Sequence, residues 1–131
     1  MLECLILGDS IAVGIHQSRP ECAVYAKSGI NSRDFVNRYI GKDLVADTVV
    51  ISLGSNDHQG IKTKNELLDL RSQVLAKKVY WILPAIKPDI QEIVEEVANK
   101  HGDWIVKIPN LAQDGIHPST RGYKKIGEII K

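Results

Sequence analysis

Ser10 is the residue of this sequence best placed to act as a nucleophile. It ends a Gly-Asp-Ser triplet that follows the first apolar run, and apolar residues with helical spacing come after it. A serine at such a point exposes its hydroxyl at the end of a strand and its backbone N–H at the start of a helix. The hydroxyl can attack a carbonyl carbon, and the N–H can stabilise the negative charge that develops on the oxygen. Serine is also a preferred helix N-cap, which is the purely structural alternative.

Asp114 and His117 form a second candidate group, within Asp-Gly-Ile-His-Pro. A turn between residues three positions apart can place the carboxylate on one imidazole nitrogen and leave the other nitrogen free. The carboxylate would then fix the tautomer of the ring and stabilise the imidazolium, as a general base requires. The alternative is a turn aspartate beside a histidine that has no catalytic role.

Asn56 and Gly29 are candidates for stabilising an oxyanion. Asn56 follows the third apolar run, and its side-chain amide can donate a hydrogen bond to a developing negative charge. Gly29 follows the second run, where the absence of a side chain lets the backbone N–H approach a ligand closely. Each residue also has an ordinary explanation as part of a turn, and Asp57 is expected to order the turn that holds Asn56. Together with Ser10 and the Asp–His pair, these donors complete the set of groups that acyl transfer needs.

Five short apolar runs predict the strands that must position these residues. They cover residues 4–7, 22–26, 48–53, 79–83 and 104–108. The third and fourth runs are nearly continuous and rich in β-branched or aromatic residues, which is typical of parallel strands buried on both faces. Amphipathic stretches separate the runs. This alternation predicts right-handed βαβ units and a three-layer α/β/α sandwich, a single domain over residues 1–131.

Capping residues mark the ends of the predicted helices. The signals for helix starts are Asn31, Thr63 (with Glu66 at capping-box spacing), Pro88 and Ser119, and the signal for a helix end is Gly102. In open parallel sheets, ligands bind beyond the carboxyl ends of the strands. Because Ser10, Gly29 and Asn56 each come shortly after a predicted strand, we expect them to share one edge of the sheet.

The combination of motifs resembles the SGNH, or GDSL-type, hydrolases. Gly8-Asp9-Ser10-Ile11 looks like the first block of that family, with Ile11 in place of the usual leucine. Residues 54–57 fit its Gly-x-Asn-Asp block, residues 114–118 fit its last block, and Ser28-Gly29 is all that matches the second block. The resemblance extends over residues 8–118, although many members of the family are longer and carry extra loops over the site.

The resemblance implies a flavodoxin-like sheet with strand order 2-1-3-4-5 and a serine esterase or lipase mechanism. The catalytic residues would be Ser10, Asp114 and His117, and the oxyanion hole would consist of Ser10, Gly29 and Asn56. Such a mechanism uses no metal or organic cofactor. Activity is expected to fall toward acid pH as the His117 imidazole takes up a proton.

The substrate is expected to be a small-molecule or carbohydrate ester with a short acyl group of acetyl type. The strands and helices use almost all of the chain, so the loops are short and leave little material for a lid or a deep acyl tunnel. The residues expected to line the site are Ile11, His58, Ile86 and Ile116.

Two other functions are compatible with parts of the sequence. A metal-dependent phosphoesterase would use oxygen and imidazole ligands at the strand ends, drawn from Asp9, Asn56, Asp57 and His58. The sequence lacks an Asp-x-His motif to complete such a site, and inhibition by a chelator rather than by a serine-directed organophosphate would favour it. The second alternative is a flavodoxin-like binding module without catalysis.

Composition limits the cellular context. The chain has 131 residues, of which 44% are hydrophobic and 25% charged, and its net charge of +1 favours neither nucleic acid nor an anionic membrane. Cys4 and Cys22 are expected to be buried free thiols, and no apolar stretch approaches the roughly 20 residues of a membrane span. Without a recognisable signal peptide, the expected location is the cytoplasm.

Overall fold

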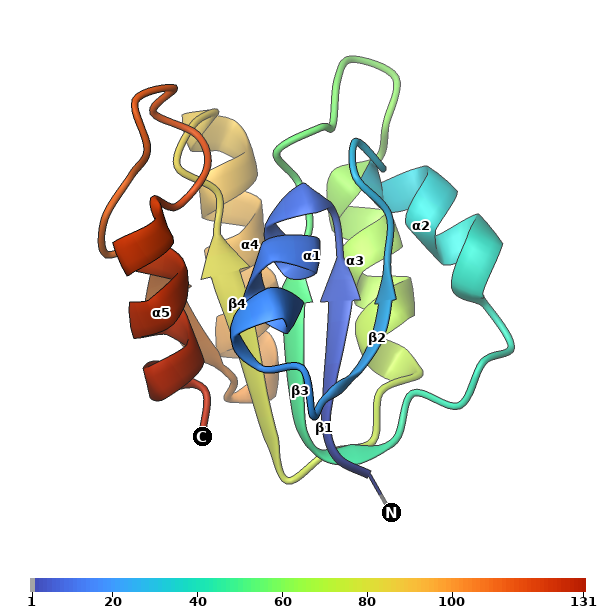
Figure 1. The fold of residues 1–131 in the computed structure, drawn as a ribbon. Coiled ribbons are helices and arrows are strands. Elements are labelled where there is room, and N and C mark those ends of the chain that lie inside the picture. The colour runs from blue at the N-terminus through green and yellow to red at the C-terminus, as the bar shows by residue number, and fades with distance from the viewer. Residues whose placement is uncertain (1) are drawn as a thin grey trace.

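Strands and helices alternate along the chain in a computed structural model, which describes residues 2–131 (Figure 1). The strands are β1 (Leu2–Gly8), β2 (Ala23–Ala26), β3 (Ala46–Ser52), β4 (Lys78–Leu83) and β5 (Trp104–Lys107). The helices are α1 (Ser10–Ser18), α2 (Ser32–Tyr39), α3 (Thr63–Ser72), α4 (Pro88–His101) and α5 (Thr120–Ile129). All five predicted strands are therefore present, with ends that differ from the prediction by at most two residues.

The strands form one parallel sheet in the order β2-β1-β3-β4-β5. This confirms the predicted α/β class and the strand order that the family resemblance implied. The chain moves outward from β1 to β2 and then returns to the other side of β1 with β3. The gap between the loops after β1 and β3 is consequently the topological switch point, where ligands bind in open α/β sheets.

Helices cover both faces of the sheet, with α1 and α5 on one side and α2, α3 and α4 on the other (Figure 1). The alternation of side chains along β1 shows why both faces are apolar. Leu5 and Leu7 lie in the core beneath α2, α3 and α4, whereas Cys4 and Ile6 lie in the core beneath α1 and α5. A strand buried in this way on both faces needs a continuous apolar sequence.

The predicted capping residues are confirmed at most helix ends. Asn31 accepts a hydrogen bond from the Asp34 N–H at the start of α2, Ser119 caps α5 in the same way, and Gly102 ends α4 with a φ of 69°. The capping role predicted for Thr63 is wrong. Thr63 is the first residue of α3, and its hydroxyl instead donates to a carboxylate oxygen of Asp57 at 2.7 Å.

Cys4 and Cys22 are joined in a disulfide, so the prediction of free thiols is wrong. The register of the sheet explains the pairing. Leu5 pairs with Ala23 across β1 and β2, which brings the preceding residues of the two segments side by side. Both cysteines are buried in the core beneath α1 and α5, although 18 positions separate them in the sequence.

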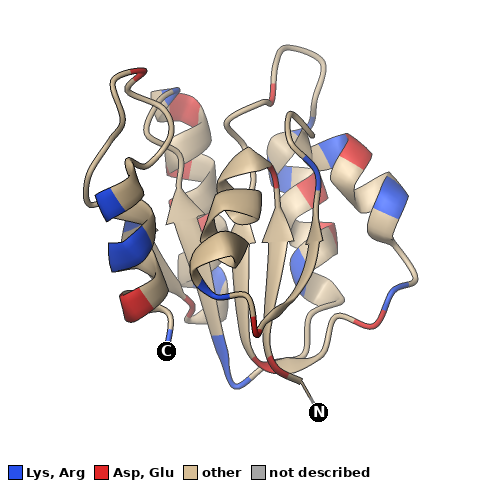
Figure 2. Ribbon diagram, in the orientation of Figure 1, with Lys and Arg blue, Asp and Glu red and all other residues tan. Residues whose placement is uncertain are grey.

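Charged residues lie mainly on the helices and loops, where both signs are interspersed (Figure 2). This distribution agrees with the near-neutral net charge of +1. Within residues 2–131, no helix has the length and apolar character needed to cross a membrane.

Candidate active site

Ser10, His117 and Asp114 form a continuous chain of hydrogen bonds at the carboxyl edge of the sheet. The distance from Ser10 Oγ to His117 Nε2 is 2.8 Å, and that from His117 Nδ1 to Asp114 Oδ2 is 2.7 Å. An ionised carboxylate can only accept, so Nδ1 carries the proton that it donates to Asp114. Nε2 is then the acceptor for the Ser10 hydroxyl, which is the arrangement in which histidine acts as a general base.

The Asp114 carboxylate is held by its own turn. Its Oδ1 accepts hydrogen bonds from the backbone N–H groups of Ile116 at 2.9 Å and His117 at 3.0 Å. These backbone hydrogen bonds, and then the one from the His117 side chain, lower the pKa of Asp114 to about 2. The group is therefore ionised, and able to orient His117, over the whole range in which enzymes ordinarily work.

Backbone hydrogen bonds close the loop that carries this pair. Ala112 N–H donates to the His117 carbonyl at 2.8 Å, and Ser119 N–H donates to the Asn110 carbonyl at 2.8 Å. The loop thus leaves β5, folds back on itself and enters α5. This path brings His117 to Ser10, although 107 positions separate the two in the sequence.

The helix cap of α1 is Asp9 and not Ser10, so the structural alternative for Ser10 is wrong. Asp9 Oδ1 accepts from the Ile11 N–H at 3.0 Å and from the Ser52 hydroxyl at 3.1 Å. This leaves the hydroxyl of Ser10, the first residue of the helix, free to reach His117. Asp9 is 1% exposed, and burial raises its pKa to about 6.

The predicted oxyanion donors lie shortly after the ends of β1, β2 and β3. The Ser10 N–H belongs to the first residue of α1, where a helix offers no internal acceptor. Gly29 has a φ of 81°, and a Cβ built there would meet nothing within 4 Å, so the space beside its Cα is open. Asn56 Nδ2 donates one hydrogen to the Ile30 carbonyl at 3.1 Å, which ties the Asn56 loop to the Gly29 loop. The second amide hydrogen is left for another acceptor.

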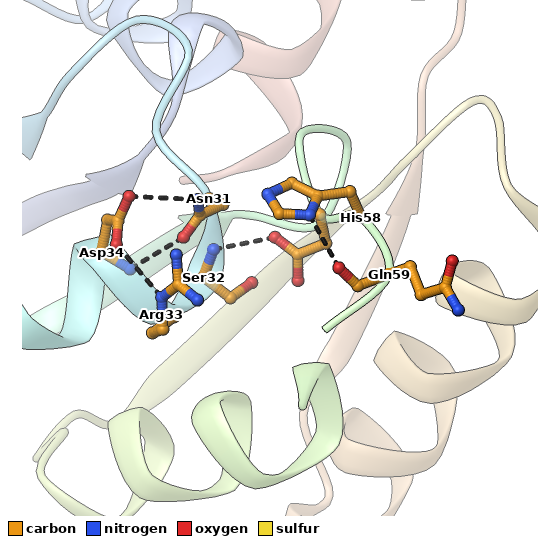
Figure 3. A network of polar contacts seen from close by, with 7 residues as sticks. Asn31, Ser32, Arg33, Asp34, His58 and Gln59 are labelled. Carbon is orange, nitrogen blue, oxygen red and sulfur yellow. Dashed lines mark hydrogen bonds and ion pairs between the residues drawn. The ribbon is translucent and has the colours of Figure 1, made fainter. Parts of the chain in front are cut away.

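Asp57 anchors the loop that carries Asn56. Its carboxylate accepts from the Ser32 N–H at 2.8 Å and from the Thr63 hydroxyl at 2.7 Å, and the residue is 2% exposed. The carboxylate thus lies between the N-termini of α2 and α3, where helix dipoles favour negative charge. Figure 3 shows the α2 side of this network, with Ser32 beside the capping pair of Asn31 and Asp34. The prediction that Asp57 orders this turn is confirmed.

Lys87 also contacts the Asn56 loop, and no sequence motif predicts this contact. Its Nζ donates to the carbonyl oxygens of Ser55 at 2.8 Å and Asp57 at 2.6 Å. A lysine before Pro88 has no local pattern that would predict this contact, because its partners are 30 and 32 positions away.

The four residues expected to line the site differ in how far their side chains are exposed. The prediction that Ile11 lines the site is wrong. Its side chain is 1% exposed and packs in the core between α1 and the sheet. His58 is exposed and turned toward the Gln59 carbonyl, 2.9 Å from its Nδ1 (Figure 3), at the wall of a cavity of about 530 Å³ between the β3–α3 loop and α4. Ile86 and Ile116 are half-buried on loops at the carboxyl edge, and their contact with substrate stays a prediction.

The ligands of the alternative metal site do not come together. Both carboxylate oxygens of Asp57 are engaged by Ser32 and Thr63, and His58 is turned toward Gln59. Across the described part of the chain, no group of three or more His, Cys, Asp or Glu side chains is arranged to hold a metal ion. The ligand set proposed for a phosphoesterase is thus not assembled.

Solved structures with the same fold include proteins assigned as an acylhydrolase, as GDSL-like lipases, as a carbohydrate esterase and as an O-acetyltransferase. A protein from Bacteroides fragilis assigned as an acylhydrolase is 19% identical, with a TM-score of 0.71 over 98% of this chain and 84% of that chain. A protein from Bacteroides ovatus assigned as a GDSL-like lipase is 16% identical, with a TM-score of 0.69 over 98% of this chain and 95% of that chain.

A third structure of this fold is the C-terminal catalytic domain of peptidoglycan O-acetyltransferase A from Streptococcus pneumoniae. It is 16% identical, with a TM-score of 0.61 over 98% of this chain and 90% of that chain. The chain matches no protein-family model and no curated protein sequence. At these identities the likeness shows a shared fold, which is the fold that the sequence motifs implied.

Proposed function

We propose that this chain is a serine esterase of the SGNH/GDSL type that hydrolyses carboxylic esters with short, acetyl-type acyl groups, including acetyl esters on carbohydrate. The observation that carries the proposal is the chain of hydrogen bonds from Ser10 through His117 to Asp114. Ser10 is the first residue of α1, Asp114 and His117 lie on the loop before α5, and the types and order of the three match the motifs of that family.

The proposed reaction begins when Ser10 Oγ attacks the acyl carbon and His117 Nε2 takes the hydroxyl proton. Asp114 stabilises the imidazolium that forms. The oxyanion accepts hydrogen bonds from the backbone N–H groups of Ser10 and Gly29 and from Asn56 Nδ2. The imidazolium then protonates the leaving alcohol, and an acyl-enzyme remains. Water attacks this ester with His117 as base, and the carboxylic acid and free Ser10 are released.

The exposure of the His117 and Asp114 side chains supports a substrate with a small acyl group. The side chains of His117 and Asp114 are 40% and 47% exposed, so the reacting groups lie at the surface rather than at the end of a tunnel. The Streptococcus pneumoniae structure of the same fold is named as a peptidoglycan O-acetyltransferase, and that name supports an acetyl-type acyl group here. Rates for p-nitrophenyl esters from acetyl to palmitoyl, together with acetylated sugars, test the proposal. A preference for the longest acyl chains would contradict it.

The serine mechanism is tested with Ser10→Ala on p-nitrophenyl acetate. We expect a loss of about three orders of magnitude or more in kcat, because no nucleophile remains. Ser72→Ala is the matched control, since Ser72 is exposed at the end of α3 and its hydroxyl donates to the nearby Asp69 carbonyl. A fluorophosphonate probe should label the wild type and Ser72→Ala but not Ser10→Ala. Equal ester hydrolysis by Ser10→Ala and the wild type would exclude the mechanism.

A further inference from the structure

The ammonium group of Lys87 binds the two carbonyl groups on either side of Asn56. Its Nζ donates to the Ser55 carbonyl at 2.8 Å and to the Asp57 carbonyl at 2.6 Å. Asn56 itself is the residue between these two, and its side chain is one of the proposed oxyanion donors. A single cation on the β4–α4 connection thus contacts both flanks of a donor on the neighbouring β3–α3 loop.

The backbone of Lys87 adopts an unusual conformation. Among residues 2–131 it is the one non-glycine residue with a positive φ, at 64°. Side chains rarely adopt this left-handed region, and such strain persists only where surrounding contacts compensate for it. The Lys87 carbonyl also accepts hydrogen bonds from the N–H groups of Ile90 at 2.9 Å and Gln91 at 3.0 Å, which start α4. The residue therefore connects the first turn of α4 to the Asn56 loop.

The other hydrogen bonds that fix the Asn56 loop do not involve the carbonyl oxygens of Ser55 and Asp57. The Asp57 carboxylate is turned toward the N-termini of α2 and α3, and the Asp57 N–H closes a turn onto the Gly54 carbonyl at 3.0 Å. The carbonyl oxygens of Ser55 and Asp57 are left to find donors elsewhere. The Lys87 ammonium supplies both donors, with the added strength of a charged group.

We propose that Lys87 is a positioning residue, which holds Asn56 where its amide can donate to the oxyanion. The inference rests on the proposed serine esterase function. Loss of an oxyanion donor costs about 100-fold to 1,000-fold in kcat, and a displaced donor loses part of that amount. The effect of Lys87 is therefore expected in kcat and not in KM, and only while Asn56 is present.

A double-mutant cycle between Lys87→Met and Asn56→Ala tests this coupling. With p-nitrophenyl acetate, Lys87→Met should lower kcat by about 10-fold to 100-fold with little change in KM. The double variant should be no slower than Asn56→Ala alone, because the lysine acts through the asparagine. Lys87→Arg should restore part of the rate. Lys62→Met is the matched control, since Lys62 lines the same cavity of about 530 Å³ without contacting the loop carbonyls, and it should retain full activity.

Lys87→Gly separates positioning from stability. Glycine removes the strain of the left-handed conformation but also removes the ammonium group. This variant should have a Tm close to that of the wild type and the same loss of kcat as Lys87→Met. A loss of kcat that followed the loss of Tm across the variants would overturn the inference, as would a double variant with additive losses.

Labelling by a fluorophosphonate distinguishes failure of this inference from failure of the proposed function. If the wild type is not labelled at Ser10, the serine mechanism itself is wrong. If the wild type is labelled and Lys87→Met is labelled at the same rate, the esterase proposal stands and the role of Lys87 is overturned. The expected result is labelling of both proteins, with Lys87→Met at least about 10-fold slower.

Discussion

Asp9 and Asp114 are two carboxylates beside the same nucleophile, and their environments shift their pKa values in opposite directions. Asp114 lies at the surface and accepts two backbone hydrogen bonds, which lower its pKa to about 2. Burial raises the pKa of Asp9 to about 6, and its Oδ2 has no hydrogen-bond partner among residues 2–131. Asp114 is therefore suited to orient a histidine, whereas Asp9 carries a charge that the folded protein solvates poorly.

Asp9 should make the protein less stable as the pH rises toward neutrality. Its folded pKa of about 6 lies above the ordinary value of 3.8, so the unfolded chain ionises first. The contribution of Asp9 to the free energy of unfolding is fully present below pH 4 and is lost between about pH 4 and 6, by on the order of 3 kcal/mol. Asn caps helices as well as Asp does, so Asp9→Asn should abolish this loss. Urea unfolding of both proteins from pH 4 to pH 7 measures the difference.

Asp43→Asn is the control for this experiment because Asp43 is exposed. Its stability profile should run parallel to that of the wild type. A parallel profile for Asp9→Asn as well would show that the buried carboxylate does not oppose folding at neutral pH.

Close contact between the ends of β1 and β3 brings Ser10 near the Asn56 loop. This contact requires a glycine at position 8. Gly8 pairs with Ser52 at the ends of the two strands, and the Asp9 N–H donates to the Ser52 carbonyl at 3.0 Å. A Cβ added to Gly8 would lie 1.9 Å from that carbonyl oxygen, and its φ is 141°. The glycine of the Gly-Asp-Ser motif is thus required by the sheet before any chemistry is considered.

Gly8→Ala is expected to lower the free energy of unfolding by at least about 3 kcal/mol, through overlap with the Ser52 carbonyl and backbone strain. Gly41→Ala is the matched control, because Gly41 also has a positive φ, of 89°, but has open space around its Cβ position. It should lose only the conformational cost, about 1 kcal/mol. Urea unfolding measures both, and equal losses would contradict the proposed overlap.

The Cys4–Cys22 disulfide connects β1 to the segment that enters β2 and so stabilises the molecule as a whole. A crosslink of 18 residues is expected to contribute about 3 kcal/mol by restricting the unfolded chain. The double substitution Cys4→Ala and Cys22→Ala should lower the free energy of unfolding by that amount. Urea unfolding with and without dithiothreitol should show a reductant effect in the wild type alone. Two free thiols in the unreduced, unfolded wild type would contradict the crosslink.

The disulfide also bears on the cellular location. Disulfides persist in oxidising compartments and are rare in the cytoplasm. The bond therefore argues for an oxidising compartment over the cytoplasmic location expected from the sequence. We propose the oxidising location, and the thiol state of the protein isolated from its native cells tests it.

Local patterns in the sequence determined the alternating strands and helices, most helix ends and the candidate triad. Apolar runs predict strands from neighbouring residues alone, and Asp114 and His117 are close enough in the sequence for one turn to join them. The strand order required the resemblance to a family, because short patterns say nothing about which strands become neighbours.

Only the tertiary structure decided the contacts between distant segments. Sheet register and the paths of the loops determine three of these contacts. They are the hydrogen bond between Ser10 and His117, the hydrogen bonds of Lys87 to the Asn56 loop, and the disulfide between Cys4 and Cys22. The prediction that Ile11 lines the site was wrong for the same reason. The packing of α1 determines which of its side chains face the sheet, and Ile11 is one of them. Sequence periodicity describes one element at a time, whereas these contacts arise when several elements pack together.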